Sequence, residues 1–195
     1  MTMRIAVAIS GRGSNLEALA RALGPEAPAE IALVLSDKSS ASGLDHARVL
    51  GIPIEVLANP EDASVWFDRL RRHRIDLLVL AGYLKLVPAP VVAAYQGRII
   101  NVHPALLPAF GGKGMYGRRV HEAVLASGAR ETGVTVHLVD EAYDQGPILA
   151  QARLPVLPDD TADTLAQRVL AVEHRILPAV VLAAAAAGRP VRLTE

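Results

Sequence analysis

Apolar residues along this chain gather in short runs, and most of the early runs are followed by a stretch with helical spacing. The lengths of the runs and the turn residues that end them predict five strands, at residues 4–9, 30–36, 53–57, 75–80 and 98–103. The intervening patterns predict helices at residues 16–23, 43–50, 63–73 and 90–97. This alternation predicts right-handed crossovers and a mostly parallel sheet with helices on both faces.

The second half of the chain departs from this alternation. Residues 131–139 alternate apolar and polar side chains, and residues 147–155 can pair with them across a loop, so we expect an antiparallel C-terminal edge on the sheet. A helix is predicted at residues 118–127. A long helix is predicted at residues 162–187, interrupted by Pro178.

The composition fits one Rossmann-like α/β domain spanning residues 1–195. Hydrophobic residues make up 51% of the chain and aromatic residues 4%, so the core is expected to consist of aliphatic side chains. Twenty basic and twenty acidic residues leave no surplus charge, which argues against a nucleic-acid partner. The lack of cysteine excludes disulfides, thiolate catalysis and cysteine-ligated metals.

The chain shows no pattern typical of export or of membrane insertion. Its first residues lack the arrangement of a signal peptide, and no apolar run reaches the roughly 18 residues that a spanning helix needs. We therefore expect a cytoplasmic protein with no membrane partner. The six histidines show no ligand spacing such as His-x-His, so no metal site is predicted.

The strand at residues 98–103 presents two polar side chains where it ends. Asn101 and His103 are two residues apart, so they project to one face of the strand with their Cα atoms roughly 6.5 to 7 Å apart. Pro104 and the following Leu-Leu-Pro end the strand and place the pair at the sheet edge where open α/β sheets bind ligands. An amide beside an imidazole suits a reaction that builds negative charge on a carbonyl oxygen. The alternative is a turn cap beside a satisfied histidine.

The loop after the first strand reads Ser-Gly-Arg-Gly-Ser-Asn and leads into a helix. The backbone amides of Gly13, Ser14 and Asn15 are expected at the helix N-terminus, where the helix dipole favours a phosphate. The first two glycines also match a dinucleotide fingerprint, but Leu16 replaces the third. A monophosphate is therefore preferred over a dinucleotide.

Two further loops have unusual compositions. The loop at residues 81–88 is apolar, and it either packs over a helix or lines a slot for a flat ring system. The loop at residues 109–117 is rich in glycine, but Gly114 follows Lys113 where a P-loop needs serine or threonine. We interpret that loop as a flap over the site.

The loop at residues 140–147 holds three acidic residues, of which Asp144 is the candidate for chemistry. If the loop folds back onto His103, the carboxylate raises the imidazole pKa and can relay a proton. We therefore expect His103 to stay protonated above the usual histidine pKa of about 6.5. The other two acids are expected to be solvated.

Two polar residues lie in otherwise apolar stretches. His137, in the middle of a predicted strand, is expected to serve the core or to support the site rather than to bind a metal. Glu173, on the long helix, is either a surface residue or a contact to a substrate hydroxyl.

Four segments taken together resemble a known family: residues 9–16, 81–88, 101–108 and 140–147. The Asn-Val-His-Pro-Ala-Leu-Leu-Pro element with the downstream aspartate is typical of formyltransferases and hydrolases that use 10-formyltetrahydrofolate. The Gly-Arg-Gly-Ser-Asn loop is similar to that of the phosphoribosylglycinamide formyltransferase family. Related tRNA formyltransferases and folate hydrolases carry additional domains, for which 195 residues leave no room.

The resemblance implies roles for the matching positions. Catalysis falls to Asn101, His103 and Asp144. The ribonucleotide phosphate and ribose fall to Gly13, Ser14, Asn15 and Glu173. Folate binding falls to Leu84, Lys85, Leu86, Val87 and Asn101. Three positions depart from the common pattern and bear on how the folate tail and the phosphate are held: Ser64, Lys85 and Leu170.

The reaction implied by the resemblance transfers the formyl group of 10-formyltetrahydrofolate, a co-substrate, to the amine of phosphoribosylglycinamide in purine biosynthesis. Asn101 and protonated His103 would stabilise the oxyanion, and Asp144 would keep His103 protonated and help move the proton. The alternatives are a 10-formyltetrahydrofolate hydrolase and a non-catalytic folate- or nucleotide-binding module. We expect small-molecule substrates and a monomer or homodimer.

Overall fold

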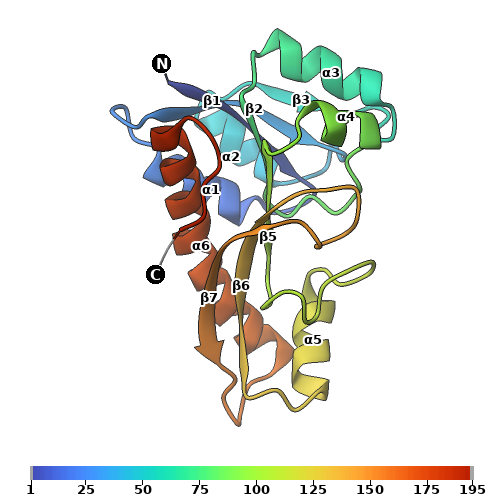
Figure 1. Ribbon diagram of the computed structural model, residues 1–195, viewed down its shortest axis with the longest axis vertical. Coiled ribbons are helices and arrows are strands. Elements are labelled where there is room, and N and C mark those ends of the chain that lie inside the picture. Colours follow the sequence, from blue (N-terminus) through green and yellow to red (C-terminus); the bar gives the residue numbers. More distant parts are fainter. Residues whose placement is uncertain (1, 194–195) are drawn as a thin grey trace.

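The computed structural model describes residues 2–193 and contains one seven-stranded sheet, with strand order β3-β2-β1-β4-β5-β6-β7 (Figure 1). In chain order the strands are β1 (Met3–Ile9), β2 (Ala29–Ser36), β3 (Ile54–Val56), β4 (Leu77–Leu80), β5 (Ile99–His103), β6 (Glu131–Leu138) and β7 (Ile148–Pro155). The helices are α1 (Ser14–Ala22), α2 (Gly43–Val49), α3 (Ala63–Arg72), α4 (Ala89–Ala94), α5 (Arg118–Ala126) and α6 (Ala162–Ala187).

The first five strands pair in parallel, and β6 and β7 are antiparallel. This confirms the predicted α/β class with an antiparallel C-terminal edge. The predicted interruption of the last helix was wrong, because α6 continues through Pro178. A proline costs the helix one backbone hydrogen bond, but Leu177, Val180 and Val181 beside it are fully buried, and their packing holds the helix together.

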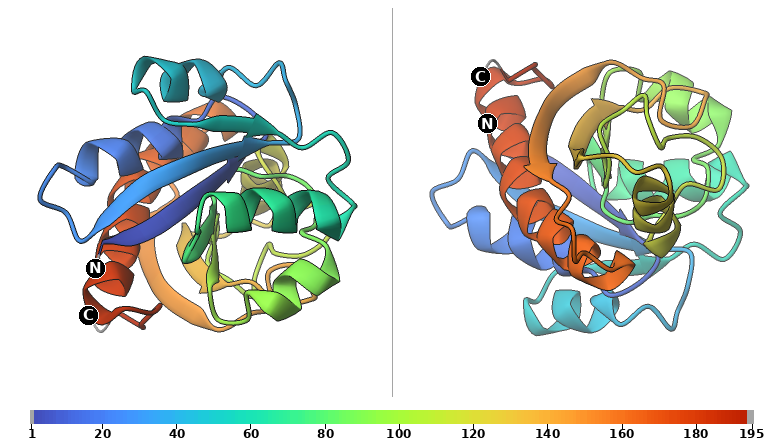
Figure 2. Two further views of the ribbon diagram at one scale, coloured as in Figure 1. Left: turned by 90° about the horizontal axis from the view of Figure 1, so that it is seen from above. Right: turned by 90° about the horizontal axis from the view of Figure 1, so that it is seen from below.

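Helices cover both faces of the sheet (Figure 2). Alternate residues of β1 divide between the two layers, since Ile5 and Val7 pack with α1, α2 and α6, whereas Ala6 and Ala8 pack with α3 and α4. The same alternation in β5 directs Ile100 toward the first layer. Asn101 and His103 therefore lie on the opposite face, as their spacing predicted.

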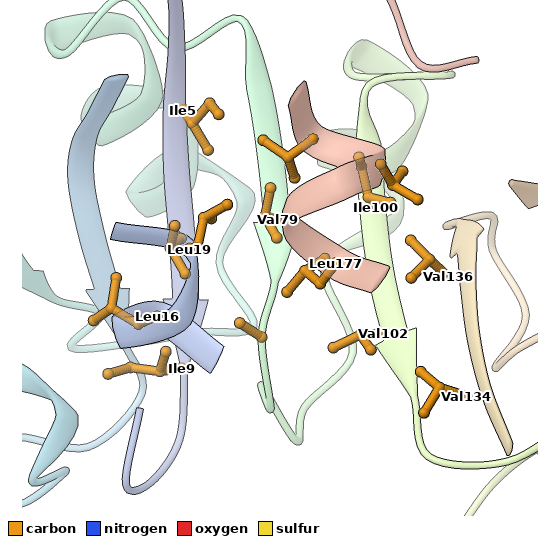
Figure 3. Close-up of a cluster of buried hydrophobic side chains, with 14 of the residues drawn as sticks. Ile5, Ile9, Leu16, Leu19, Val79, Ile100, Val102, Val134, Val136 and Leu177 are labelled. Carbon is orange, nitrogen blue, oxygen red and sulfur yellow. The ribbon is translucent and has the colours of Figure 1, made fainter. Parts of the chain in front are cut away.

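The larger core cluster joins strands that are far apart in the sequence (Figure 3). Its strand residues include Ile5, Ile9, Val79, Ile100, Val102, Val134 and Val136, and its helix residues include Leu16, Leu19 and Leu177. Nearly all are aliphatic, as the low aromatic content predicted. Each fully buried side chain of this kind contributes about 1.5–3 kcal/mol, so the cluster stabilises both the parallel strands and the antiparallel edge.

Helix α6 is long and apolar enough to cross a membrane by length and composition. The expectation based on uninterrupted apolar runs did not identify this helix, because Glu173 and Arg175 interrupt the apolar stretch of α6. In the fold, α6 packs against α1, α5, β6 and β7. Its apolar face is part of the larger core cluster, which accounts for its composition.

The loop after β1 passes the start of α2 at very short range. A Cβ atom on Gly43 would lie 2.6 Å from Cδ1 of Ile9 and 2.8 Å from the Cα atom of Gly13. The Gly43 amide donates a hydrogen bond to the Gly11 carbonyl at 3.0 Å. Only backbone fits at this crossing, and the crossing fixes the path of the loop that leads into α1.

We predict that Gly43→Ala destabilises the protein by about 1–3 kcal/mol, because the new methyl group overlaps backbone atoms that cannot move independently. Urea denaturation followed by circular dichroism measures the change. Gly24→Ala is the matched control, since a Cβ atom there meets no heavy atom within 4 Å. Equal midpoints for the two variants would contradict the close crossing.

Candidate functional site

A cavity of about 430 Å³ opens at the carboxyl ends of β1, β4 and β5. Its walls come from the loops after these strands, from the loop after β6, and from α5 and α6. The predicted site residues that line it are Leu84, Lys85, Leu86, Val87, Asn101, His103, Asp144 and Glu173. Gly13, Ser14 and Asn15 do not line it, but Arg12 in the same loop does.

His103 is buried and held between two loops. Its Nε2 atom lies 2.8 Å from the Phe110 carbonyl oxygen, which only accepts, so Nε2 carries the hydrogen. Its Nδ1 atom lies 3.6 Å from Oδ2 of Asp144, an ion-pair distance that is longer than a direct hydrogen bond. In the neutral ring, Nδ1 is therefore the nitrogen that can take up and release a proton.

Asp144 brings this part of the site together. The Gly112 amide donates to its Oδ2 atom at 2.9 Å, and the Asn101 amide nitrogen and His137 Nε2 lie 3.4 and 3.5 Å from its Oδ1 atom. Burial raises the pKa of Asp144, but the neighbouring His137 and His103 rings and the Gly112 amide together lower it below the usual value. The carboxyl group is therefore ionised, and its side chain is only 10% exposed.

The predicted direction of the His103 pKa was wrong. Burial lowers the pKa of His103, and this outweighs the opposing effects of the Asp144 carboxylate and the Phe110 carbonyl. His103 has almost no contact with water, and a charged imidazole loses more hydration there than one carboxylate at 3.6 Å returns. At neutral pH the neutral ring predominates.

His137 supports Asn101 from the neighbouring strand, directly opposite it in the β5–β6 ladder. Its Nδ1 atom donates to the Leu138 carbonyl at 2.8 Å, which leaves Nε2 to accept from the Asn101 amide nitrogen at 3.0 Å. The supporting role predicted for His137 is therefore confirmed. The second amide hydrogen of Asn101 has only the longer contact with Asp144, so it is the one available to a ligand in the cavity.

The glycine-rich loop at residues 109–117 contacts both His103 and Asp144 through its backbone, at Phe110 and Gly112. Phe110 adopts a φ of 57°, which is uncommon for a residue with a side chain. A Cβ atom on Gly111 would lie 2.5 Å from the Leu107 side chain and 3.2 Å from that of Asp144. Because residue 111 is a glycine, this loop can approach His103 and Asp144 closely.

Two residues after the cavity residue Arg12, α1 begins at Ser14 with Gly13 as its N-cap, at a φ of 74°. A glycine offers no side chain to cap the first amides of the helix, which stay available to a ligand. The Asn15 side chain donates to Glu173 at 2.5 Å, and this bond joins α1 to α6.

Glu173 is buried rather than on the surface, so the surface alternative considered for it was wrong. Burial raises the pKa of Glu173 to about 7, although the Asn15 hydrogen bond opposes this shift. Leu170 lies one turn earlier on α6 and lines the same cavity. The acid is therefore a buried hydrogen-bonding group that can change its charge near neutral pH.

The apolar loop after β4 lines the cavity, and only some of its side chains are buried against the rest of the protein. Leu84 and Leu86 are 43% and 49% exposed, unusually high for leucine, and Val87 is buried. The Leu84 amide donates to the Ser10 hydroxyl at 3.0 Å, and that hydroxyl donates to Asp37 at 2.6 Å. This chain of bonds ties the apolar loop to the loop after β1.

Two cavity residues were not singled out from the sequence. His121 on α5 is buried, its Nδ1 atom has no partner among residues 2–193, and its pKa is lowered by burial and by nearby His103. The sequence signal for the burial of His121 is its position with Val120 and Val124 on the apolar side of a predicted helix. The other is Arg12, whose side chain is exposed at the cavity.

Of the three departures from the family pattern, Lys85 and Leu170 line the cavity and Ser64 does not. Its amide donates to Asp62, which caps α3. Within residues 2–193 no group of three or more histidine, aspartate or glutamate side chains is placed to hold a metal ion.

The chain matches known proteins in both sequence and fold. The profile of the formyl transferase family matches residues 3–181. A chloroplastic phosphoribosylglycinamide formyltransferase of Vigna unguiculata is 44% identical over 185 residues, which cover 91% of this chain. This chain spans only 59% of the length of that relative.

Two bacterial proteins match over most of both chains. The phosphoribosylglycinamide formyltransferase of Bacillus subtilis (strain 168) is 38% identical over 91% of this chain and 92% of its own. The crystal structure of the phosphoribosylglycinamide formyltransferase from Anaplasma phagocytophilum superposes with a TM-score of 0.90, at 41% identity over 96% of this chain and 88% of that one. On these matches, this chain belongs to the formyl transferase family, among the relatives of phosphoribosylglycinamide formyltransferase.

Proposed function

We propose that the protein transfers the formyl group of 10-formyltetrahydrofolate to the amine of phosphoribosylglycinamide. The observation that carries this proposal is the meeting of Asn101, His103 and Asp144 in one cavity, which is lined by an apolar loop and by Arg12, two residues before an uncapped helix N-terminus. A folate ring system and a phosphorylated sugar amine are the two kinds of molecule that such walls would accept. The names of the matched relatives agree with phosphoribosylglycinamide as the acceptor of a formyl group.

We assign the oxyanion to Asn101 and His103. As the amine attacks the formyl carbon, the free amide hydrogen of Asn101 would bond the oxygen on which negative charge develops. Bonding with His137 fixes the orientation of that amide in advance, so little reorganisation is needed. One such donor is typically worth roughly 10²- to 10³-fold in rate.

The lowered pKa of His103 assigns the order of proton transfer. The neutral imidazole accepts the proton that the attacking nitrogen must lose, at Nδ1, and becomes a cation beside the oxyanion. It then returns this proton to N10 of the folate as the bond between the formyl carbon and N10 breaks. The ionised Asp144 stabilises the cation between the two transfers, from 3.6 Å.

We assign the ribonucleotide to the α1 end of the cavity and the folate to the apolar loop. Glu173 would accept hydrogen bonds from ribose hydroxyls, and the first amides of α1, at Ser14 and Asn15, would bond the phosphate. Leu84 and Leu86 would pack on the folate ring, which explains their exposure. Lys85, which lies between them and lines the cavity, would meet the charged folate tail.

The remaining expectations form part of the same proposal. They are a cytoplasmic location, a single domain over residues 1–195, and a monomer or homodimer with no nucleic-acid or membrane partner. No bound metal is required, because each assigned step is a proton transfer or a hydrogen bond made by side chains of this chain.

A coupled assay of the purified protein with 10-formyltetrahydrofolate and phosphoribosylglycinamide tests the function. We expect tetrahydrofolate and formylated ribonucleotide in equal amounts. Formate released at the same rate without the ribonucleotide would identify a hydrolase instead. Binding of either molecule without turnover would identify a binding module.

Asp144→Asn tests the proton relay. We predict that it lowers kcat by about 10²- to 10⁴-fold while both substrates still bind, because the carboxylate acts on a charge that exists only during the reaction. It should also lower the pKa of His103 further, since the raising effect of Asp144 is lost. Following the His103 ring signals by NMR across pH checks this second effect. A near-normal kcat with an unchanged His103 titration would remove Asp144 from the mechanism.

Glu173 should make the stability of the protein depend on pH. Its pKa is raised on folding from 4.5 to about 7, so the folded state prefers the protonated acid. The contribution of Glu173 to the free energy of unfolding should be fully present below about pH 4.5. It should be lost as pH rises through 7, which lowers the stability of the wild type by up to about 3 kcal/mol.

Glu173→Gln should remove this decline, and melting temperatures of the variant and the wild type between pH 5 and 8.5 measure it. Glu141→Gln, which changes an exposed loop acid, is the matched control. If the melting temperatures of the Glu173 variant and the wild type change in parallel with pH, the ionisation of Glu173 does not destabilise the folded protein.

A further inference from the structure

We infer that the Arg12 side chain binds the phosphate of the ribonucleotide and is the main determinant of preference for the phosphorylated substrate. This inference rests on the proposed function and extends it. The backbone amides of α1 form one part of the phosphate site. Arg12, which lies two residues before the first residue of α1 and lines the cavity, supplies the charge that they lack.

The backbone of Arg12 is fixed although its side chain is exposed. The preceding Gly11 carbonyl accepts from the Gly43 amide at 3.0 Å. The following Gly13 is buried, adopts a φ of 74°, and would place a Cβ atom only 2.7 Å from the Gly43 Cα atom. Both neighbours are thus held by the crossing with α2, so the guanidinium starts from a defined point at the cavity rim.

Three lysine or arginine side chains line the cavity: Arg12, Lys85 and Arg118. Arg118 already pairs with Glu122 at 2.8 Å and with Asp163. Lys85 belongs to the apolar loop, between two leucines assigned to the folate. Within residues 2–193, no carboxylate lies within 4.0 Å of the Arg12 guanidinium, so this cation is not neutralised by the protein.

The charge balance at this end of the cavity requires a cation. A phosphate monoester carries about −1.5 to −2 charges at pH 7, whereas a helix N-terminus supplies only about +0.5. Glu173 adds negative charge when it is ionised, and Leu170 on the same face of α6 offers neither charge nor a donor. An arginine fork that donates two parallel hydrogen bonds to phosphate oxygens fits this need.

A second observation, on the first turn of α1 beside the cavity, also points to a ligand. Asn15 is only 7% exposed, and its Oδ1 atom has no hydrogen-bond partner among the described residues. Its amide group is held by Glu173, so the oxygen cannot turn to find one inside the protein. A buried acceptor of this kind suits a hydroxyl donor from the sugar that carries the phosphate.

The test is Arg12→Gln, measured by steady-state kinetics and by calorimetric titration with phosphoribosylglycinamide. We expect KM and Kd for the ribonucleotide to rise about 10- to 100-fold, as for the loss of a charge-assisted hydrogen-bonded pair. The KM for 10-formyltetrahydrofolate and kcat should change by less than about twofold. Arg21→Gln, which removes the same charge from the far end of α1, is the matched control and should leave all three constants unchanged.

Two further measurements separate phosphate binding from a general effect of charge or folding. With the dephosphorylated substrate, glycinamide riboside, the wild type and Arg12→Gln should have the same KM. Adding Leu170→Lys to Arg12→Gln should restore at least a tenth of the lost affinity, because position 170 faces the same cavity. A ribonucleotide KM that is unchanged in Arg12→Gln, or an equal rise for both substrates, would overturn the inference.

The outcome also distinguishes this inference from the proposed function. A wild type that binds the ribonucleotide through Arg12 but transfers no formyl group would refute the function and keep the phosphate site. Formyl transfer by the wild type together with an unchanged ribonucleotide KM in Arg12→Gln would keep the function and refute the role of Arg12. Absence of any calorimetric binding of the ribonucleotide to the wild type would refute both.

Discussion

The whole site depends on the parallel register of β1, β4 and β5. In this register Ala8, Leu80 and Asn101 form one row across the sheet. The strands end within a few residues of this row, so the loops that leave them emerge side by side. The mostly aliphatic strands and the helices on both faces keep the row in place. The loop after β1, the apolar loop after β4 and the end of β5 therefore meet without any element devoted to joining them.

Within that frame, two buried acids are tuned in opposite directions. Asp144 receives a backbone amide and lies beside two histidines, so its charged form is stabilised despite burial. Glu173 has only the Asn15 side chain, so burial prevails and the acid is neutral more readily. The first suits a group that must keep a charge beside a proton carrier. The second suits a group that holds neutral sugar hydroxyls.

The loops contribute backbone rather than side chains to the buried pair, and this explains their composition. Phe110 and Gly112 reach His103 and Asp144 through a carbonyl and an amide, and the glycine between them leaves no room for a side chain. Asp144 itself has a φ of 57°, a strained conformation that the surrounding hydrogen bonds hold. Precision at the site thus comes from loops fixed at several points, which include the bonds from Ser10 to Leu84 and Asp37.

The sequence by itself determined the alternation of strands and helices, the antiparallel edge, and the shared face of Asn101 and His103, because these follow from local periodicity. It also determined the family, since the strand-end motif is specific. The tertiary structure alone decided which atoms face each other and how deeply they are buried. The pKa of His103, the burial of Glu173, the pairing of Asn101 with His137 and the unneutralised charge of Arg12 all depend on contacts between residues distant in the chain. Electrostatic energies depend on burial and distance, and neither quantity is encoded in the local pattern of one segment.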